Sequence, residues 1–299
     1  MADRKGALVL LFNQDFMIGS KVLLHSLRRS PALSKMDIVI ITDDEVIAQS
    51  SEFKEIAKII RFVSPEEKER FSLLPRESIN EVFHLSWAPK YTFLKFFIYD
   101  NFGYDYHLYL DSDIICTSNA DSILDIFFAS EANIMGGPVF PRSIARSAEG
   151  DRYSQEITYR NLLNYLEAPK GNLNTGVLIY DKTLMSPRIG DALIEIARVG
   201  GRPNEQSIVQ NFLSNSPDIK FEKLNPLFNF RSSYLRSIDR KHARQLVRQI
   251  KFLHFIANHP WSQGATGGFP ARLWQEELAS MESSAAGSPP ADRMPDLET

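Results

Sequence analysis

The feature that most limits the fold of this chain is the repeated order of an apolar run followed by an amphipathic stretch. The run "ALVLLF" at 7–12 is typical of a buried strand, and apolar residues recur at helical spacing over 17–30. The same order returns with a strand over 36–42, a helix over 45–60 and a third strand over 59–63. Such alternation predicts an α/β fold, with a mostly parallel sheet and helices on both of its faces.

The rest of the chain continues the mixed pattern. With 299 residues, it is long enough for one large domain or two small ones. A stretch rich in Ser, Ala and Pro predicts a disordered tail over 280–299, so we expect a single domain over 1–279. Further helices are expected over 88–102, 120–130, 153–167, 186–200 and 204–215, and further strands over 106–111, 132–140, 172–181 and within 250–261.

Charge and cysteine content narrow the function classes. The formal net charge of -3 argues against nucleic-acid binding through bulk charge. Cys116 is the single cysteine, the first apolar run is short for a signal peptide, and no stretch reaches the roughly 18 apolar residues of a membrane span, so we expect a cytoplasmic location. The basic segment 236–251 predicts a helix that either meets an anionic acceptor or membrane surface, as a peripheral contact, or faces solvent.

The run "HLYLDSDIIC" at 107–116 sets Asp111 and Asp113 where a buried strand leaves the sheet. Ligands of open α/β sheets bind beyond the carboxyl ends of the strands, and paired carboxylates suit Mg²⁺ or Mn²⁺ bridging the phosphates of a nucleotide. An ordinary turn is the alternative, because Asp and Ser bond to nearby backbone amides. Haloacid-dehalogenase-like phosphatases also carry Asp-x-Asp after a strand, but normally after the first one.

Five segments in the right order resemble glycosyltransferase family 8, the glycogenin-like retaining nucleotide-sugar enzymes. The resemblance covers residues 7 to about 261 and implies a GT-A fold, which is a Rossmann-like, single nucleotide-sugar-binding domain. The segments are "ALVLLFNQDFMIGSKVLLHSL", "LKFFIYDNFGYDYHLYLDSD", "NTGVLIYD", "NEQSIVQNF" and "FLHFIANHPW".

The resemblance implies roles for particular residues. Asp111, Asp113 and His254 would hold the metal, with Mn²⁺ favoured by the imidazole and Mg²⁺ as the alternative. Lys95 would face the donor, with Lys90 as the competing candidate. The other donor-binding residues implied are Leu10, Phe12, Asn13 and Phe16 at the base, Ser112 between the aspartates, Asn174, Thr175, Gly176, Glu205 and Gln206 at the sugar, and Ala257 and His259 near the diphosphate.

Each of these assignments has a structural alternative. Leu10 and Phe12 could be core residues, the lysines solvated helix charges, and His254 a hydrogen-bonded histidine in a strand. "NTG" at 174–176 could be a turn entering a strand, and Glu205 a first-turn acid favoured by the helix dipole.

The sequence departs from the family pattern near its end. His259 stands where members usually carry a Lys before Pro-Trp, and Ala257 stands where a glycine is expected in the turn. Glu205 replaces the Asp of many members and is one methylene longer. The contacts to the diphosphate and to the sugar hydroxyls are therefore the parts of the resemblance that carry over least.

The implied reaction transfers a hexose, glucose or galactose, from a UDP-sugar to an acceptor hydroxyl with retention at the anomeric carbon. Asn174, Glu205 and Gln206 would lie at the reactive face, and an amide is a poor nucleophile, so we expect same-face attack. The acceptor would be a glycan, a lipopolysaccharide core or a small molecule, since 262–299 contains no Tyr for self-glucosylation. A metal-dependent phosphatase and a non-catalytic nucleotide-sugar binder are the alternatives.

Overall fold

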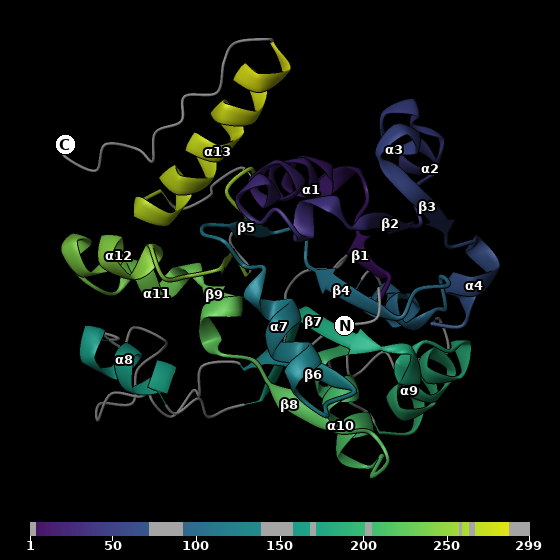
Figure 1. Cartoon of the computed structure of the whole chain (residues 1–299). Coiled ribbons are helices and arrows are strands. Elements are labelled where there is room, and N and C mark those ends of the chain that lie inside the picture. The colour runs from purple at the N-terminus through teal and green to yellow at the C-terminus, as the bar shows by residue number, and fades with distance from the viewer. Residues whose placement is uncertain are drawn as a thin grey trace.

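The computed structural model describes residues 4–71, 92–138, 158–167, 172–200, 205–256, 259–262 and 267–286. Lys90, Ala257 and the start of the helix expected over 88–102 lie outside these ranges. Within them, helices cover both faces of a central seven-stranded sheet (Figure 1). The predicted α/β class is confirmed.

The strands of the central sheet lie in the order β3-β2-β1-β4-β7-β6-β8. β3, β2, β1 and β4 run parallel to one another, whereas β7 runs antiparallel to both of its neighbours, β4 and β6. This antiparallel strand brings the start of β7 beside the end of β4, where the Asp111 amide donates to the Gly176 carbonyl at 2.8 Å. The strands are β1 (Gly6–Leu11), β2 (Asp37–Thr42), β3 (Ala57–Phe62), β4 (Tyr106–Leu110), β6 (Ile134–Pro138), β7 (Leu173–Asp181) and β8 (Phe221–Lys223).

The alternation of side chains along β1 builds a core on each face of the sheet. Leu8 and Leu10 point into the cluster that includes α1, α2, α3 and α7, whereas Val9 and Leu11 point into the cluster with η3, α9 and α10. The first group of helices is α1 (Gln14–Ser26), α2 (Glu45–Gln49), α3 (Ser51–Ile56) and α7 (Ser122–Ala129), and the second is η3 (Leu94–Tyr99), α9 (Pro187–Gly200) and α10 (Glu205–Ser214).

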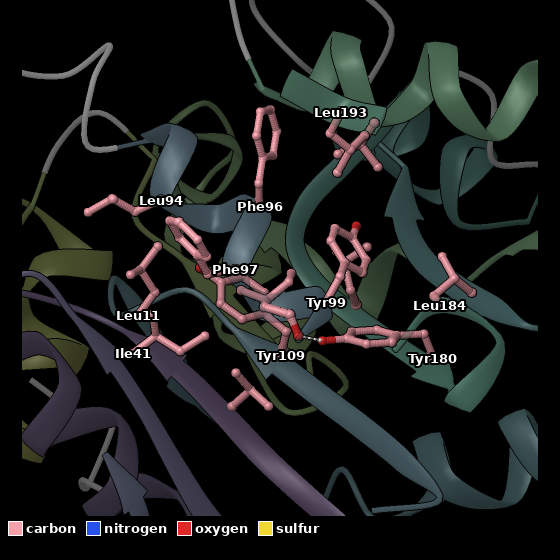
Figure 2. Packing of buried hydrophobic residues seen from close by; sticks show 14 of the residues in the cluster. Leu11, Ile41, Leu94, Phe96, Phe97, Tyr99, Tyr109, Tyr180, Leu184 and Leu193 are labelled. Atoms are coloured by element: carbon pink, nitrogen blue, oxygen red, sulfur yellow. Dashed lines mark hydrogen bonds between the residues drawn. The ribbon is translucent and has the colours of Figure 1, made fainter. Parts of the chain in front are cut away.

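Aromatic side chains dominate the core under η3. Figure 2 shows Phe97 and Tyr99 of η3 in one cluster with the strand residue Tyr109 and the helix residue Leu193. Burying a side chain of this size stabilises the fold by about 1.5–3 kcal/mol. The packing holds η3 rigidly against the sheet, and η3 carries Lys95.

Two helices expected from the sequence are shorter in the structure. The helix predicted over 45–60 is wrong as a single element, because Ser50 has an extended ψ of 125° that separates α2 from α3, and β3 already begins at Ala57 to pair with β2. Of the helix predicted over 88–102, residues 92–93 are α-helical and 94–99 form the 3-10 helix η3, which ends before Asp100.

A second, three-stranded sheet joins the C-terminal part of the chain to the aspartate motif. It has the order β5-β10-β9, with β5 (Ile114–Cys116) antiparallel and β9 (Phe230–Arg231) parallel to β10 (Phe252–His254). In this register His254 lies opposite Ile114 and Arg231. The Phe255 amide also donates to the Asp113 carbonyl at 2.8 Å, so the last strand is bonded directly to the motif.

The C-terminal helix α13 (Phe269–Ala285) packs against α1 (Figure 1). The tail predicted from residue 280 is therefore wrong over 280–285, because Ser280 accepts a hydrogen bond from Arg28 and Met281 packs on the core. Glu277, only 4% exposed, binds Arg28 and Arg29, which fixes the helix in place. Residues 287–299 of the predicted tail lie outside the described ranges.

The basic segment 236–251 is helical over a shorter stretch than predicted. Asp239 caps α12 (Arg240–Val247) by accepting from the His242 amide, and Ala243, Leu246 and Val247 form its buried face. No helix among the described residues is long and apolar enough to cross a membrane. The remaining short elements are α4 (Pro65–Glu69), α8 (Tyr159–Glu167), α11 (Ser232–Arg236), η1 (Leu27–Arg29), η2 (Leu33–Lys35), η5 (Lys182–Leu184) and η6 (Pro226–Asn229).

Candidate functional site

Two carboxylates and one imidazole meet where β4 leaves the central sheet. Asp111 follows β4, and Asp113 precedes β5, the neighbour of β10. His254 Nε2 lies 3.0 Å from Asp113 Oδ1 and 3.6 Å from Asp111 Oδ2, and one ligand atom from each of the three residues lies within 4.8 Å of the others. The three residues predicted as metal ligands therefore lie together.

A chain of amides orients His254. Its Nδ1 lies 2.8 Å from Asn229 Oδ1, and the Asn229 amide donates to Asn174 Oδ1 at 2.7 Å. Because the Asn229 amide nitrogen donates to Asn174, its oxygen faces Nδ1 and accepts from it, which leaves Nε2 as the ring nitrogen that faces the carboxylates. Two carboxylates and an oriented imidazole are a donor set that fits a divalent cation such as Mn²⁺.

Gly176 leaves room for this histidine. A Cβ built at Gly176 would lie 2.3 Å from His254 Cε1 and 2.8 Å from His254 Nδ1. The sequence predicted that Gly176 lets the backbone approach a sugar. The structure supplies a different reason for the glycine, because only a residue without a side chain lets His254 pack at this position.

Lys95 lies at the centre of an acidic cluster. Its Nζ is 2.9 Å from Asp111 Oδ1 and 3.5 Å from Glu205 Oε1, and the residue is only 8% exposed. Burial alone lowers the pKa of Lys95, but the two carboxylates outweigh it and raise this pKa above its ordinary value. The alternative of a solvated helix charge is wrong for Lys95, which stays protonated and offsets the charge of the acids.

The first turn of α10 meets the start of β7. The Thr175 hydroxyl donates to Glu205 Oε1 at 2.7 Å, and the Asn174 amide donates to Gln206 Oε1 at 3.0 Å. Asn174, Glu205 and Gln206, the three residues assigned to the reactive face, thus form one connected group beside the three candidate metal ligands. The turn alternative for residues 174–176 is wrong, because they lie within β7.

His259 closes the other side of the site. Its Nε2 lies 3.4 Å from Asp113 Oδ2, and its ring stacks on Trp261 at 5.1 Å and meets Phe16 edge-on at 5.0 Å. Burial raises the pKa of Asp113, but the two facing imidazoles of His254 and His259 outweigh it and hold this pKa below its usual range.

The residues predicted for the base divide into two kinds. Leu10 and Phe12 are fully buried in the core, which is the alternative that the sequence left open for them. Phe16 is partly buried beside His259. Asn13 stands at the N-terminal end of α1 without capping it, and its Oδ1 is buried with no hydrogen-bond partner among the described residues. Asn13 therefore offers a free acceptor next to the site.

Ser112 plays a supporting part. Its hydroxyl donates to the Leu11 carbonyl at 3.1 Å and accepts from the Ser20 hydroxyl at 2.8 Å, so it ties the aspartate turn to β1 and α1.

Sequence reasoning missed Asn229 and also Tyr109, whose hydroxyl donates to Asp111 Oδ1 at 2.6 Å. Two-residue spacing along an exiting strand was a usable signal for Tyr109, because it places both side chains on one face. Nothing local marked Asn229.

Comparisons with known proteins agree with this geometry. The model of the family described as "Glycosyl transferase family 8" matches residues 7–265. No curated protein matches the chain by sequence.

Solved structures share the fold at low sequence identity. The glycosyltransferase GlyE of Streptococcus pneumoniae TIGR4 is 20% identical, with a TM-score of 0.54, over 97% of this chain and 66% of GlyE. The galactosyltransferase LgtC, solved with donor and acceptor sugar analogs, is 16% identical, with a TM-score of 0.56, over 92% of this chain and 95% of LgtC. The bifunctional glycosyltransferase WbbM is 16% identical, with a TM-score of 0.55, over 95% of this chain and 51% of WbbM.

These matches decide between the alternatives left by the sequence. The chain spans about two thirds of GlyE and half of WbbM, and almost all of LgtC. The match over 7–265 contradicts the phosphatase interpretation of the two aspartates. The chain belongs to glycosyl transferase family 8 and has the GT-A fold.

Proposed function

We propose that this protein is a retaining, metal-dependent transferase that moves a hexose, glucose or galactose, from a UDP-sugar to an acceptor hydroxyl. The observation that carries the proposal is the group of Asp111, Asp113 and His254 at the carboxyl end of β4, with Lys95 beside it. A carboxylate pair with an oriented imidazole suits a cation that binds a diphosphate. LgtC was solved in complex with both a donor and an acceptor sugar analog, which supports a two-substrate site.

The metal would be held by one oxygen from each of Asp111 and Asp113 and by His254 Nε2. When bound, Mn²⁺ or Mg²⁺ supplies the positive charge that stabilises the leaving diphosphate. Asn229 accepts from His254 Nδ1, and Lys95 offsets the charge of Asp111. These contacts leave Nε2 as the ring nitrogen directed at the site where the cation would bind.

Other residues would bind the two ends of the donor. The buried, unpartnered Oδ1 of Asn13 fits an N–H donor on the uracil ring, and the Phe16 ring offers apolar area next to it. His259, which lies 3.4 Å from Asp113, would donate a hydrogen bond to the diphosphate in place of the usual lysine. Asn174 and Gln206, joined by a hydrogen bond, would face the sugar.

The arrangement favours attack on the same face that the leaving group departs from. Glu205 is a carboxylate beside Lys95 outside the proposed metal ligands, and its Oε1 is already held by Thr175 and Lys95. A carboxylate paired with a lysine is a weaker nucleophile, and the amide of Gln206 is a poor one. The acceptor hydroxyl would therefore attack the anomeric carbon directly, passing its proton to a phosphate oxygen as the C–O bond to the diphosphate breaks.

The test is hydrolysis of UDP-sugars without an acceptor. UDP-glucose and UDP-galactose are incubated with Mn²⁺, Mg²⁺ or a chelator, and UDP release is measured. We expect hydrolysis of at least one donor, dependent on the metal and lost in Asp113→Asn. The control is Asp191→Asn, an exposed carboxylate on α9. Equal hydrolysis in Asp113→Asn and wild type contradicts the metal assignment, and donor binding without any UDP release supports the non-catalytic binder instead.

Trapping experiments separate the two retaining routes. Same-face attack predicts that no glycosyl adduct accumulates on the protein when a slow, fluorinated UDP-sugar is supplied. Mass spectrometry of the intact chain measures this directly. A hexosyl adduct mapped to Glu205 contradicts direct attack while leaving the proposed donor and metal untouched.

A further inference from the structure

A pocket opens beside the amides that orient the candidate metal site. Asn174 and Asn229 form part of its wall, together with Arg231 and the aromatic residues Phe230 and Tyr234. Its enclosed volume is about 20 Å³, which is room for a water-sized group. The enclosed part thus accepts a substituent of a few atoms, and a whole sugar ring would lie at its mouth.

Arg231 brings an uncompensated positive charge to this pocket. The residue is half-buried, and its Nε is shielded from solvent with no hydrogen-bond partner among the residues that the structure describes. No ion pair of the described residues includes Arg231, and none of the described lining residues carries a carboxylate. A guanidinium is always charged, and shielding one from water without a partner is costly. The pocket therefore fits an anionic group.

The register of the small sheet places Arg231 next to the reaction centre. β9 pairs in parallel with β10, so that Arg231 lies opposite His254. Neighbouring strands are about 4.8 Å apart. Asn229, two residues before Arg231, bonds to both His254 and Asn174. An anion bound by Arg231 would thus lie on a molecule that reaches the sugar-facing amides, separate from the diphosphate at Asp111 and Asp113.

We propose that this pocket belongs to the acceptor site and that Arg231 selects an acceptor sugar bearing a phosphate or carboxylate group. The proposal rests on the glycosyl transfer proposed above. The planar fork of a guanidinium binds either anion in a bidentate way. Phe230 and Tyr234 supply the apolar area on which the sugar ring would pack. Arg231 would act as a specificity-determining residue and take no part in bond breaking.

The test compares acceptors that differ in one group. Methyl glucosides and methyl galactosides are used in neutral, 6-phosphorylated and 6-carboxylate forms, with radiolabelled UDP-glucose and UDP-galactose as donors. We expect wild-type kcat/KM to be higher, by about tenfold or more, for an anionic form than for its neutral counterpart. Comparing the phosphorylated and carboxylate forms then decides which anion is recognised.

The variants isolate the guanidinium. In Arg231→Met we expect the ratio of anionic to neutral kcat/KM to fall to about one, and in Arg231→Lys to an intermediate value, because the charge remains but the fork is lost. Arg248→Met is the matched control, since Arg248 is exposed and follows α12 outside the pocket. Circular dichroism checks that each variant is folded, and Arg231→Gln replaces Arg231→Met if the latter is not.

Several results overturn the inference. The wild type could show no preference for the anionic acceptors, or could hydrolyse the donor without using any of these acceptors. The ratio of anionic to neutral kcat/KM could also stay unchanged in Arg231→Met. A loss of donor affinity in Arg231→Met with an unchanged ratio also overturns it, since Arg231 would then bind the donor. If no UDP-sugar is hydrolysed at all, the proposed function fails, and equilibrium binding of the same methyl glycosides to wild type and Arg231→Met still decides the role of Arg231.

Discussion

Adding one methyl group at Gly176 provides the sharpest test of how the metal site is built. In Gly176→Ala the new Cβ would lie 2.3 Å from His254 Cε1. Non-bonded carbon atoms pack at about 3.5–4.0 Å, so His254 has to retreat by about 1.2–1.7 Å. His254 is only 3% exposed and its Nδ1 is bonded to Asn229, so a movement of the ring disturbs this hydrogen bond.

The expected magnitude has two parts. Overpacking a buried site typically costs about 1–3 kcal/mol, which we expect to see in the free energy of unfolding. Substituting a residue that orients a metal ligand typically weakens metal binding by about 10–100-fold. The Mn²⁺ affinity of Gly176→Ala should therefore fall by about tenfold or more.

Isothermal titration with Mn²⁺ alone measures the affinity, and urea denaturation without metal measures the stability. Gly267→Ala is the matched control, because a Cβ at Gly267 meets nothing within 4 Å. Wild-type Mn²⁺ affinity in a stably folded Gly176→Ala would refute the reasoning, since it would mean that the position of His254 does not limit metal binding.

Three further predictions concern other parts of the molecule. Burial lowers the pKa of His107 to about 4, so between pH 6.5 and 4 the unfolded chain binds more protons than the folded one, and stability falls as the pH drops through this window. The loss in the free energy of unfolding should reach about 3 kcal/mol, as measured by urea denaturation across this pH range. His107→Phe should remove this contribution to the pH dependence, and an unchanged pH dependence in the variant would contradict the prediction. Glu277→Gln should lower the free energy of unfolding by about 2 kcal/mol, because Arg28 and Arg29 lose a buried carboxylate, whereas the exposed Glu282→Gln should not. Asn13→Ala should raise the KM for the UDP-sugar by about tenfold without changing Mn²⁺ affinity, and an unchanged KM would mean that the base binds elsewhere.

The strands and the aspartate pair were the most predictable features of this molecule. A continuous apolar run such as 7–12 has to be buried on both faces, and its alternate residues Leu8 and Val9 do enter opposite cores. Asp111 and Asp113 were found because carboxylates at the end of such a run need a partner. His254 was identified only through the family resemblance, since its pairing with the aspartates depends on a strand contact between distant parts of the chain.

The errors arose where a distant contact outweighs a local pattern. Helical spacing continues past Ser50, but pairing of Ala57 with Ile38 of β2 ends the helices early. The composition around Ser280 is typical of a tail, yet Arg28 and Glu277 hold this stretch as a helix. Asn229 follows Pro226 in a short 3-10 helix without periodicity, and its partners come from β7 and β10.

The position of β10 between β5 and β9 determines when the site can form during synthesis. A nascent chain that ends before residue 252 already contains β1, β2, β4 and both aspartates. It lacks the imidazole of His254 and the Phe255 amide that bonds to Asp113. The three ligands meet only after most of the chain has left the ribosome. Cation binding at the proposed metal site would therefore require β10 to be in place, and the binding energy would stabilise this strand in the small sheet.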